Sequence, residues 1–578
     1  MQKVIRQRPC PTGANVFSPD LPALLQRIYA ARGINSQAEL DYRLQCLTTP
    51  ESLKGLDNAL ALLEESLTKQ LRVLVVGDFD ADGATSTVVA VQCLRAMGHR
   101  DVDFLVPNRF EYGYGLTPEI VAVAKDRSPD LIITVDNGIS SLDGVAAACA
   151  AGIRVLITDH HLPGAHLPLA DAIVNPNQPD CEFPSKHLAG VGVIFYLMSA
   201  LRSRLRAKGW FASCGLAEPN MAEYLDLVAL GTIADVVPLD YNNRVLVSQG
   251  LDRMRAGRIR PGIRALLDVA GRSLGQLTAS DLGFAVGPRL NAAGRLDDMS
   301  LGIRCLMSDS ETEAFHLAQE LNDLNDDRKQ IEASMQAEAI KALEQLRLQS
   351  EVQLPSGIVL YQAGWHQGVI GILASRIKDR LHRPVIVFAD AENDGMLKGS
   401  GRSVEGIHLR DTLDAIAAHN PHILSKFGGH AMAAGLSLAP EHLPRFTELF
   451  DKAILEQIGV EGLCAELLTD GCLQPDEFSL DNAYAIRRCG PWGQHFPEPA
   501  FHGEFRVLQH RVLGGKHLKL LLTLEPEASP LDAIAFNIDM ARWPAEGAER
   551  IRAVFKLDIN DYRGQQSVQL LLAYFEVL

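Results

Sequence analysis

Short apolar runs and helical patterns alternate through residues 71–158, and this alternation restricts the fold more than any other feature of the chain. Four runs rich in β-branched residues have the length of buried strands: Leu71–Val76, Val102–Val106, Leu131–Val135 and Arg154–Thr158. Three segments with a helical pattern lie between them: Ala84–Met97, Pro118–Lys125 and Ser141–Ala151. Repeated strand–helix–strand units form a parallel sheet that helices cover on both faces. We therefore predict an α/β fold for this part of the chain.

The remaining sequence divides into regions of different character, as expected for a chain of 578 residues, which is too long for one core. We expect an N-terminal segment over residues 1–45, and the α/β domain over residues 46–308. A long polar helical pattern predicts a connecting helix over residues 309–354. A second α/β domain is expected over residues 355–457. Its predicted strands and helices are Ile358–Tyr361, Val385–Phe388, Gly435–Leu438, Val369–Arg380 and Leu409–Ala418.

The last region, residues 458–578, loses the helical pattern. Five short alternating or β-branched runs follow one another there: Glu504–Leu508, Leu518–Leu524, Ala533–Phe536, Ala553–Leu557 and Ser567–Phe575. Several short strands without intervening helices are typical of a small barrel, and the OB type is the natural candidate. Such barrels bind single-stranded nucleic acid, usually with aromatic stacking. The aromatic residues in this stretch are Tyr484, Trp492, Phe496, Phe501 and Phe505, although most aromatics of a small barrel belong to its core.

An acidic cluster follows the first predicted strand. Asp78, Asp80 and Asp82 occupy alternate positions between Gly77 and Gly83. Three carboxylates this close repel one another unless a cation holds them. An acidic surface turn is the simpler interpretation, but this cluster leaves a buried strand and a helix follows it at once. We therefore hypothesise a cation site here.

The later strands add residues of the same chemistry. Asp136 follows the third strand, and Asp159, His160 and His161 follow the fourth. The carboxyl ends of parallel strands meet at one edge of the sheet, where open α/β folds bind their ligands. Asp235, which follows an apolar helix, is a further candidate. These side chains are therefore expected to converge in space.

Aspartates with a neutral imidazole, and without a thiolate, suit Mn²⁺ or Mg²⁺. Four or more carboxylates carry enough charge for two divalent ions. Two ions roughly 3.5–4 Å apart can activate water and stabilise the attacking and leaving oxygens of a phosphoryl transfer. The pattern therefore favours a dinuclear hydrolase, while a structural role is the alternative for each histidine.

Six motifs in this order resemble the DHH phosphoesterase family and its associated DHHA1-type second domain. They are Asp78–Gly83, Asp136–Gly138, Asp159–His161, the segment around Asp235, Gly399–Ser403 and Gly428–His430. With the connecting helix and the C-terminal β-region, the chain resembles, from about residue 45 to its end, the bacterial single-strand-specific 5′→3′ DNA exonucleases of that family. The resemblance implies hydrolysis of single-stranded DNA to 5′-mononucleotides in DNA repair, including mismatch repair, and in recombination.

The resemblance also implies roles at the metal site. The implied metal ligands are Asp78, Asp80, Asp82, Asp136, His160 and Asp235. Asp80 and Asp82 would bind different ions, with Asp136 bridging them. His160 and Asp235 would complete the second ion, and Asp78 would ligate or orient nearby. The implied catalytic residues are Asp80, Asp82, Asp136, Asp159, His160 and His161, with His161 at the scissile phosphate or the attacking water.

Two glycine-rich segments are candidates for binding phosphate. Gly428, Gly429 and His430 offer backbone N–H groups that can approach a phosphate closely. Gly399–Ser403 combines two hydroxyls with an arginine. Tight turns are the alternative for both segments. The resemblance implies that Ser400, Arg402 and Arg109 hold a terminal 5′-phosphate, and that Arg289 and Arg295 contact the DNA backbone.

Composition limits the partners and the location. A net charge of −16 argues against a protein that coats nucleic acid with its whole surface, but it permits a local basic channel. The N-terminus lacks the apolar run of a signal peptide, and we expect a cytoplasmic protein without membrane contact. The resemblance implies single-stranded DNA, single-strand-binding protein and a RecQ-type helicase as partners, and a monomer.

Two other functions remain open from the sequence. One is a DHH enzyme acting on cyclic dinucleotides, very short oligonucleotides or pyrophosphate, although these substrates do not require the β-region after residue 458. The other is a scaffold without catalysis in a replication complex, which the intact acidic motifs disfavour.

Overall fold

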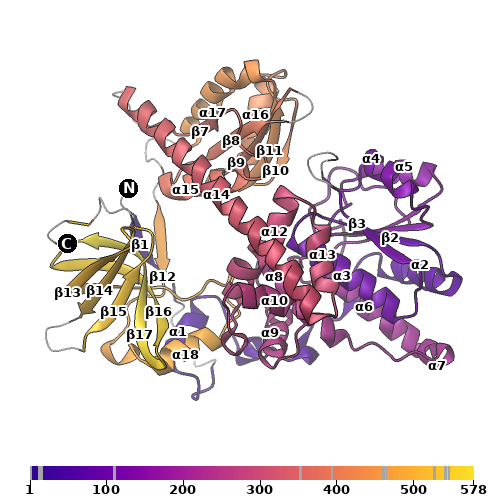
Figure 1. Ribbon diagram of the computed structural model, residues 1–578, viewed down its shortest axis with the longest axis horizontal. Helices are drawn as coiled ribbons and strands as arrows, with labels where there is room; N and C mark the ends of the chain where they lie inside the picture. The colour runs from indigo at the N-terminus through magenta and orange to yellow at the C-terminus, as the bar shows by residue number, and fades with distance from the viewer. Residues whose placement is uncertain are drawn as a thin grey trace. The chain divides into compact units, whose positions relative to one another are not determined.

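The computed structural model describes residues 3–10, 17–107, 112, 114–349, 354–391, 395–458, 463, 465–524, 529–538, 543–544 and 547–578 (Figure 1). These residues form two compact units, which are described separately. The larger unit comprises residues 5–291, 299–319 and 467–578, and the smaller comprises residues 1–4, 292–298 and 320–466. The limits of the five regions expected from the sequence stay a prediction.

A parallel sheet of five strands organises the larger unit, and it confirms the predicted α/β fold. The strands are β2 (Val73–Gly77), β3 (Val102–Leu105), β4 (Leu131–Val135), β5 (Arg154–Thr158) and β6 (Ala172–Val174). They lie in the order β3-β2-β4-β5-β6. Every residue of β2 and β4 is buried, which explains their continuous apolar sequence.

Helices cover both faces of this sheet (Figure 1). α4 (Pro118–Lys125) and α5 (Leu142–Ala150) pack on one face, where their side chains join Leu74, Ile132 and Ile157 in one core cluster. α2 (Leu56–Lys69), α3 (Ala81–Ala96) and α6 (Gly190–Ala207) lie on the other. Further helices of the larger unit are α7 (Trp210–Cys214), α8 (Leu225–Ala234), α9 (Tyr241–Arg255), α10 (Pro261–Val269), α11 (Ala279–Asp281), the π-helix η6 (Leu282–Val286) and α13 (Ser300–Met307). α12 (Gly287–Leu296) begins in the larger unit and ends in the smaller one.

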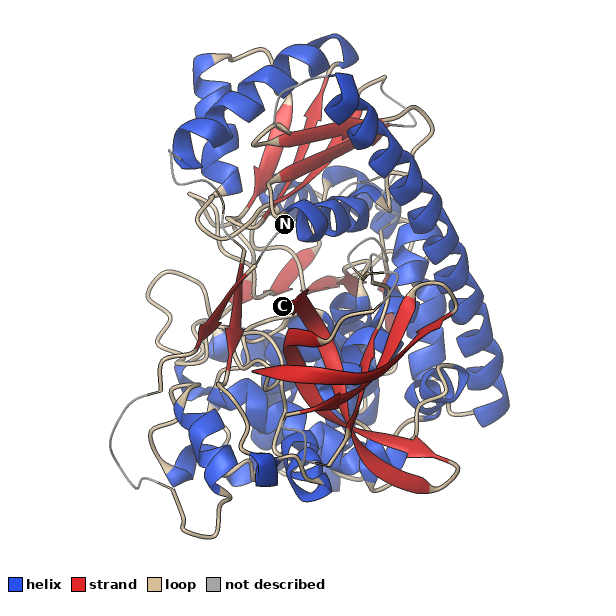
Figure 2. Ribbon diagram, turned by 90° about the vertical axis from the view of Figure 1, so that its left-hand side faces the viewer, coloured by secondary structure: helices blue, strands red, loops and turns tan. Residues whose placement is uncertain are grey.

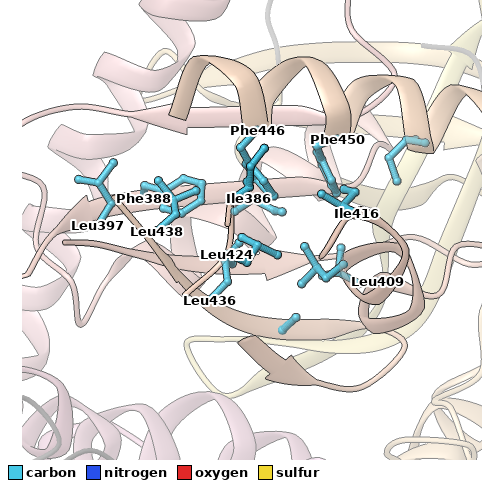
Figure 3. Packing of buried hydrophobic residues seen from close by; sticks show 14 of the residues in the cluster. Ile386, Phe388, Leu397, Leu409, Ile416, Leu424, Leu436, Leu438, Phe446 and Phe450 are labelled. Carbon is cyan, nitrogen blue, oxygen red and sulfur yellow. The ribbon is translucent and has the colours of Figure 1, made fainter. Parts of the chain in front are cut away.

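The predicted connecting helix is α14 (Glu311–Gln349), which runs from the larger unit into the smaller one. The smaller unit contains a five-stranded sheet in the order β10-β11-β9-β8-β7. Its elements are β7 (Ile358–Tyr361), α15 (Ile370–Leu381), β8 (Val385–Asp390), β9 (Leu397–Arg402), α16 (Leu409–His419), β10 (Lys426–Gly429), β11 (Ala433–Leu438) and α17 (Leu443–Ile458). Phe388, Phe446 and Phe450 lie in the core between the sheet and the helices α16 and α17 (Figure 3).

The C-terminal strands close into a barrel, as the sequence predicts, in the order β13-β14-β15-β17-β16 (Figure 2). They are β13 (Phe501–Leu513), β14 (His517–Thr523), β15 (Leu531–Ala535), β16 (Arg550–Tyr562) and β17 (Gln565–Val577). Phe496, Phe501 and Phe505 are buried, so these three candidates for base stacking belong to the core. Trp492 stacks on Phe496 and Tyr484 hydrogen-bonds Gln566, so both are engaged within the protein.

The N-terminal segment packs against the barrel region. β1 (Val4–Gln7) pairs with β12 (Glu466–Thr469), and α1 (Ala23–Ala30) contacts α18 (Leu480–Arg488). Across the described residues, no helix has the length and apolar character needed to cross a membrane.

Candidate metal centre

Three loops at the carboxyl edge of the parallel sheet carry the predicted site residues. The loop after β2 holds Asp78, and its Asp80 caps α3 by accepting hydrogen bonds from the N–H groups of Asp82 and Gly83. Asp136 follows β4 with a left-handed backbone, at φ +63°. Asparagine and aspartate adopt this conformation more readily than other residues with a Cβ. The sheet topology therefore brings together residues that lie far apart in the sequence.

The remaining residues come from β5 and from a helix behind it. Asp159, His160 and His161 follow β5, and Asp235 caps the C-terminus of α8. The ligand atoms of the predicted residues form three groups, each with all atoms within 4.8 Å of one another. The groups are Asp78, Asp80 and Asp136; Asp82, His160 and Asp235; and Asp136, His160 and His161. All six predicted metal ligands are thus brought together, and Asp136 and His160 each belong to two groups.

Three buried atoms at the centre of these groups have no hydrogen-bond partner among the described residues. They are Oδ1 of Asp136, Nε2 of His160 and Oδ2 of Asp235. Nε2 of His160 lies 3.1 Å from Oδ1 of Asp136 and 3.4 Å from Oδ2 of Asp235. Unsatisfied buried polar atoms are costly, and a divalent cation would satisfy all three. The residues present therefore fit a metal ion.

The protonation states of these groups without an ion support the same conclusion. Burial, and then the neighbouring His161, lower the pKa of His160 to about 4, so its imidazole is neutral and can act as a ligand. Burial and the adjacent carboxylates raise the pKa of Asp82 and of Asp136 well above the ordinary value. The same causes raise the pKa of Asp235 to about 7. These carboxylates repel one another, and bound cations would remove that repulsion.

Two glycines make room for these carboxylates: Gly190, which the sequence analysis did not single out, and Gly231, the first residue of the segment around Asp235. The N–H groups of Gly190 and Val191, at the start of α6, donate to Asp82 at 2.7 and 3.0 Å. This fixes the carboxylate of Asp82 at the positive end of a helix. A Cβ at Gly231 would lie 2.7 Å from Oδ1 of Asp82, so α8 can approach only because position 231 has no side chain.

Asp159 is saturated with hydrogen bonds and belongs to none of the three groups. It accepts from the N–H groups of Ile139, His160 and His161, and its Oδ1 lies 2.8 Å from Nδ1 of His161. Burial lowers the pKa of His161, but the hydrogen bond and charge of Asp159 outweigh burial and raise it to about 9. The hydroxyl of Tyr114, which the sequence analysis did not single out, lies 3.2 Å from Nδ1 of His161. The geometry of Asp159 is that of a residue that orients His161.

Asn291 is another residue that sequence reasoning missed. Its Oδ1 accepts a hydrogen bond of 2.7 Å from the N–H of Ala81, inside the first acidic motif. The asparagine lies between Arg289 and Arg295, for which the resemblance implies contacts with the DNA backbone. The sequence gives no signal for this role, which becomes evident only because α12 lies beside the loop after β2.

The predicted phosphate-binding segments lie side by side in the smaller unit. Gly399–Arg402 belongs to strand β9, and Gly428–Gly429 ends strand β10, with β11 between them. Ala433 of β11 pairs with Arg402, and its carbonyl accepts from the N–H of His430 at 2.8 Å. The sheet register therefore brings the two segments together.

Arg402 lacks an acidic partner in the part of the chain that the structure describes. Its Nη1 donates to Oγ of Ser400 at 3.1 Å and to the carbonyl of Gly401 at 2.8 Å. Burial lowers the pKa of Arg402, and no carboxylate among the described residues forms an ion pair with it. Its side chain also approaches the first turn of α15, because a Cβ at Gly371 would lie 3.0 Å from Nη2. A partly buried guanidinium beside a helix N-terminus is suited to an anion.

The other predicted DNA contacts are distributed over both units. Arg289, in the larger unit, donates to the carbonyl of Ala285 at 2.6 Å. Arg295, in the smaller unit, donates to the carbonyl of Gly368 at 3.1 Å. Arg109 lies outside the described residues.

Comparison with known proteins assigns the family. Three family models match the chain: "DHH family, N-terminal domain" at residues 72–232, "DHHA1 domain" at residues 354–456 and "RecJ OB domain" at residues 469–574. The chain is 54% identical over 574 residues to the single-stranded-DNA-specific exonuclease RecJ of Dickeya dadantii (strain 3937), covering 99% of each protein.

Solved structures agree with this relationship. The crystal structure of RecJ from Thermus thermophilus in complex with Mn²⁺ matches with a TM-score of 0.78 at 30% identity, covering 96% of this chain and 76% of that one. The complex of the same protein with Mg²⁺ matches with a TM-score of 0.72 at 29% identity, covering 96% and 74%. The chain belongs to the RecJ family of DHH proteins.

Proposed function

We propose that this chain is a metal-dependent, single-strand-specific 5′→3′ exodeoxyribonuclease that releases 5′-mononucleotides and acts in DNA repair and recombination. The observation that carries this proposal is the convergence, at the carboxyl edge of the sheet, of atoms from Asp136, His160 and Asp235 that have no hydrogen-bond partner among the described residues. Relatives that match over nearly the full length are named single-stranded-DNA-specific exonucleases.

Two divalent ions, Mn²⁺ or Mg²⁺, fit the three groups of ligand atoms. Asp78 and Asp80 would hold one ion, while Asp82, His160 and Asp235 would hold the other. Asp136 would bridge the two ions, because it belongs to one group with Asp78 and Asp80 and to another with His160. When bound, such a pair supplies Lewis-acid activation of water and stabilises the charge that builds up on the phosphate.

The protein's own residues would orient the substrate and hold the charge of the site. Asp159 would keep His161 protonated and correctly directed, so that His161 can donate a hydrogen bond to the scissile phosphate. Asn291 would hold the backbone of the first acidic motif through Ala81. Rigid support of this kind preserves the geometry that phosphoryl transfer requires.

The smaller unit supplies a place for a terminal phosphate. Ser400, Arg402, Gly428, Gly429 and the side chain of His430 are the residues that we assign to the 5′-phosphate, because the N–H of His430 already donates to the carbonyl of Ala433; Arg109 is added by resemblance alone. Arg289 and Arg295 are assigned to internal phosphates. The absence of an acidic partner for Arg402 among the described residues supports this assignment.

The barrel is assigned to the single strand leaving or entering the site, with affinity from charge and stacking. Single-strand-binding protein and a RecQ-type helicase as partners, a monomeric state and a cytoplasmic location complete the proposal.

Asp136→Asn tests the function. Asparagine tolerates the left-handed backbone at φ +63° but removes the charge that would bridge two ions. We expect hydrolysis of single-stranded DNA to be abolished while DNA binding persists, because affinity comes mainly from phosphate contacts elsewhere. Labelled single strands, duplexes and dinucleotides, with the label at either end, reveal strandedness, polarity and product.

The control is Asp143→Asn, which changes an exposed aspartate on α5 outside the three ligand groups. It should retain wild-type activity. Hydrolysis by Asp136→Asn above about a tenth of the wild-type rate would contradict the bridging role, since a bridging ligand is required in the transition state. Preference of the wild type for dinucleotides over long strands would contradict the exonuclease assignment.

A further inference from the structure

Phe284 is an aromatic side chain that the fold leaves in solvent. It lies in the π-helix η6 with 83% of its surface exposed, whereas Leu282, Ala285 and Val286 of the same turn are buried. Single exposed apolar residues are common, so exposure alone decides nothing. The exposure of Phe284 suggests a function only because its helix packs beside the candidate metal centre.

The turn that carries Phe284 packs on the helix that carries Asp235. A Cβ at Gly283 would lie 3.2 Å from Cγ2 of Ile233. Farther along, a Cβ at Gly287 would lie 3.3 Å from Cβ of Ala234. Asp235 caps this same end of α8. Gly283, the residue before Phe284, therefore packs directly on α8, and α8 ends at the candidate metal ligand Asp235.

The chain after Phe284 is also tied to the metal centre. Pro288 has no N–H to offer to the carbonyl four residues earlier, that of Phe284, which favours the departure from α-helical geometry. Asn291 then binds the backbone of Ala81 in the first acidic motif at 2.7 Å. The exposed ring is thus held on a rigid element between two parts of the site.

A second exposed apolar side chain follows Asp235 directly in the chain. Val236 has 62% of its surface exposed and a left-handed backbone at φ +62°. A β-branched residue in this conformation is strained, and such strain persists mainly at functional sites. Two exposed apolar side chains therefore belong to the segments that end or pack at Asp235, and a metal ion or a phosphate does not require them.

We propose that Phe284 stacks on an unpaired base of the single strand beside the scissile phosphate, and so acts as a positioning residue. The proposal rests on the function proposed above. An aromatic ring accepts every base, because each base has a π-face, and this suits an enzyme that must move along any sequence. Arg289, which follows in the next turn, would contact the adjacent phosphate.

The test compares Phe284→Ala with Phe315→Ala, since Phe315 is an exposed phenylalanine of α14 in the same unit. Each variant is assayed on intact strands and on strands with one abasic site, moved through the first nucleotides from the 5′ end. Loss of one stacking contact should raise KM about five- to a hundredfold and leave kcat within about twofold. Phe315→Ala should match wild type, and Phe284→Trp should restore KM.

The abasic series identifies the partner. For the wild type, KM should rise when the base that stacks on Phe284 is missing. For Phe284→Ala, removal of the same base should not raise KM further, because the stacking contact is already lost. The proposal would be overturned if Phe284→Ala had the KM of the wild type. It would also be overturned if the substitution raised KM by the same factor on intact strands and on every abasic strand. A wild-type protein that hydrolyses no single-stranded DNA would instead refute the proposed function, so the two failures are distinct.

Discussion

Gly190 leaves space that the carboxylate of Asp136 fills. A Cβ at Gly190 would lie 2.6 Å from both Cβ and Oδ1 of Asp136, closer than real Cβ contacts allow. The N–H of the same glycine donates to Oδ2 of Asp82 at 2.7 Å. The first residue of α6 therefore sets the positions of two carboxylates that belong to different ligand groups.

Gly190→Ala should displace Asp136 and weaken metal binding. Loss of a residue that orients a ligand typically costs about 10- to 100-fold in metal affinity or activity, and we expect at least that loss in kcat/KM. Titration calorimetry with Mn²⁺ and single-strand hydrolysis measure the two effects. Gly192→Ala, in the same helix, is the control, because the nearest atoms to its Cβ would all belong to the Leu188 side chain, of which only Cδ2, at 3.0 Å, is closer than an ordinary contact. Wild-type Mn²⁺ affinity in Gly190→Ala would show that Asp136 is not a ligand.

Without bound metal, the free energy of unfolding should decrease as the pH rises above about 6.5. The folded protein without metal has raised pKa values at Asp82 and Asp136, and that of His161 is about 9. The unfolded chain titrates these groups near about 3.9 and 6.5. The folded protein therefore binds more protons than the unfolded chain between about pH 6.5 and 9, and its free energy of unfolding decreases with pH. The lowered pKa of His160, about 4, acts in the opposite direction only below this range.

Thermal unfolding with a chelator and with Mn²⁺ measures this effect. With chelator, the unfolding midpoint should fall between about pH 6.5 and 9. Bound Mn²⁺ displaces the protons, so with Mn²⁺ present the midpoint should fall less. Asp136→Asn removes one buried charge and should flatten the slope in chelator. A midpoint that rises with pH in chelator would contradict the assigned protonation states.

A buried ion pair ties the N-terminal segment to the barrel region. Nη1 of Arg32 lies 2.7 Å from Oδ1 of Asp470, and both side chains are 1% exposed. Removing one partner of such a pair typically costs about 3–5 kcal/mol, and here Arg8, whose Nε lies 4.0 Å from Oδ1 of Asp470, would compensate only part of the charge that remains. We therefore expect Arg32→Met to lower the denaturant midpoint strongly. The double variant Arg32→Met/Asp470→Leu should recover part of the loss, and an unchanged midpoint in Arg32→Met would show that the pair is open to solvent.

The sequence was sufficient for the parts of this molecule that follow from local pattern and sheet topology. β4, β5 and β7 have the predicted limits, because each is a short apolar run with a clear boundary. The convergence of Asp78, Asp136 and His160 followed from one rule, that parallel strands end at the same edge.

Contacts between distant elements could not be predicted in the same way. The roles of Gly190 and Gly231 depend on how closely two helices approach the sheet edge, and no local pattern records that distance. The burial of Phe501 and Phe505 depends on which face of each barrel strand points inward. The saturation of Asp159 by backbone N–H groups likewise depends on loop geometry.

Arg402 provides the sharpest test of end recognition. Its guanidinium contacts Ser400 and a backbone carbonyl, and it has no ion-pair partner among the described residues. A terminal phosphate there would gain charge-assisted hydrogen bonds, each contributing about 1.5–3 kcal/mol. Arg402→Ala should therefore lower kcat/KM about tenfold or more on 5′-phosphorylated strands. Strands that end in a hydroxyl cannot make this contact, so the substitution should leave their kcat/KM nearly unchanged.

The control for this experiment is Arg410→Ala, which removes an exposed arginine of α16 paired with Asp414. It should leave both substrates unaffected. If Arg402 held the internal backbone instead, its loss would slow phosphorylated and hydroxyl-ended strands alike, because both present the same internal phosphates. The ratio of kcat/KM between the two substrates, measured for wild type and variant, separates the two roles. An equal ratio in both proteins would exclude Arg402 from end recognition.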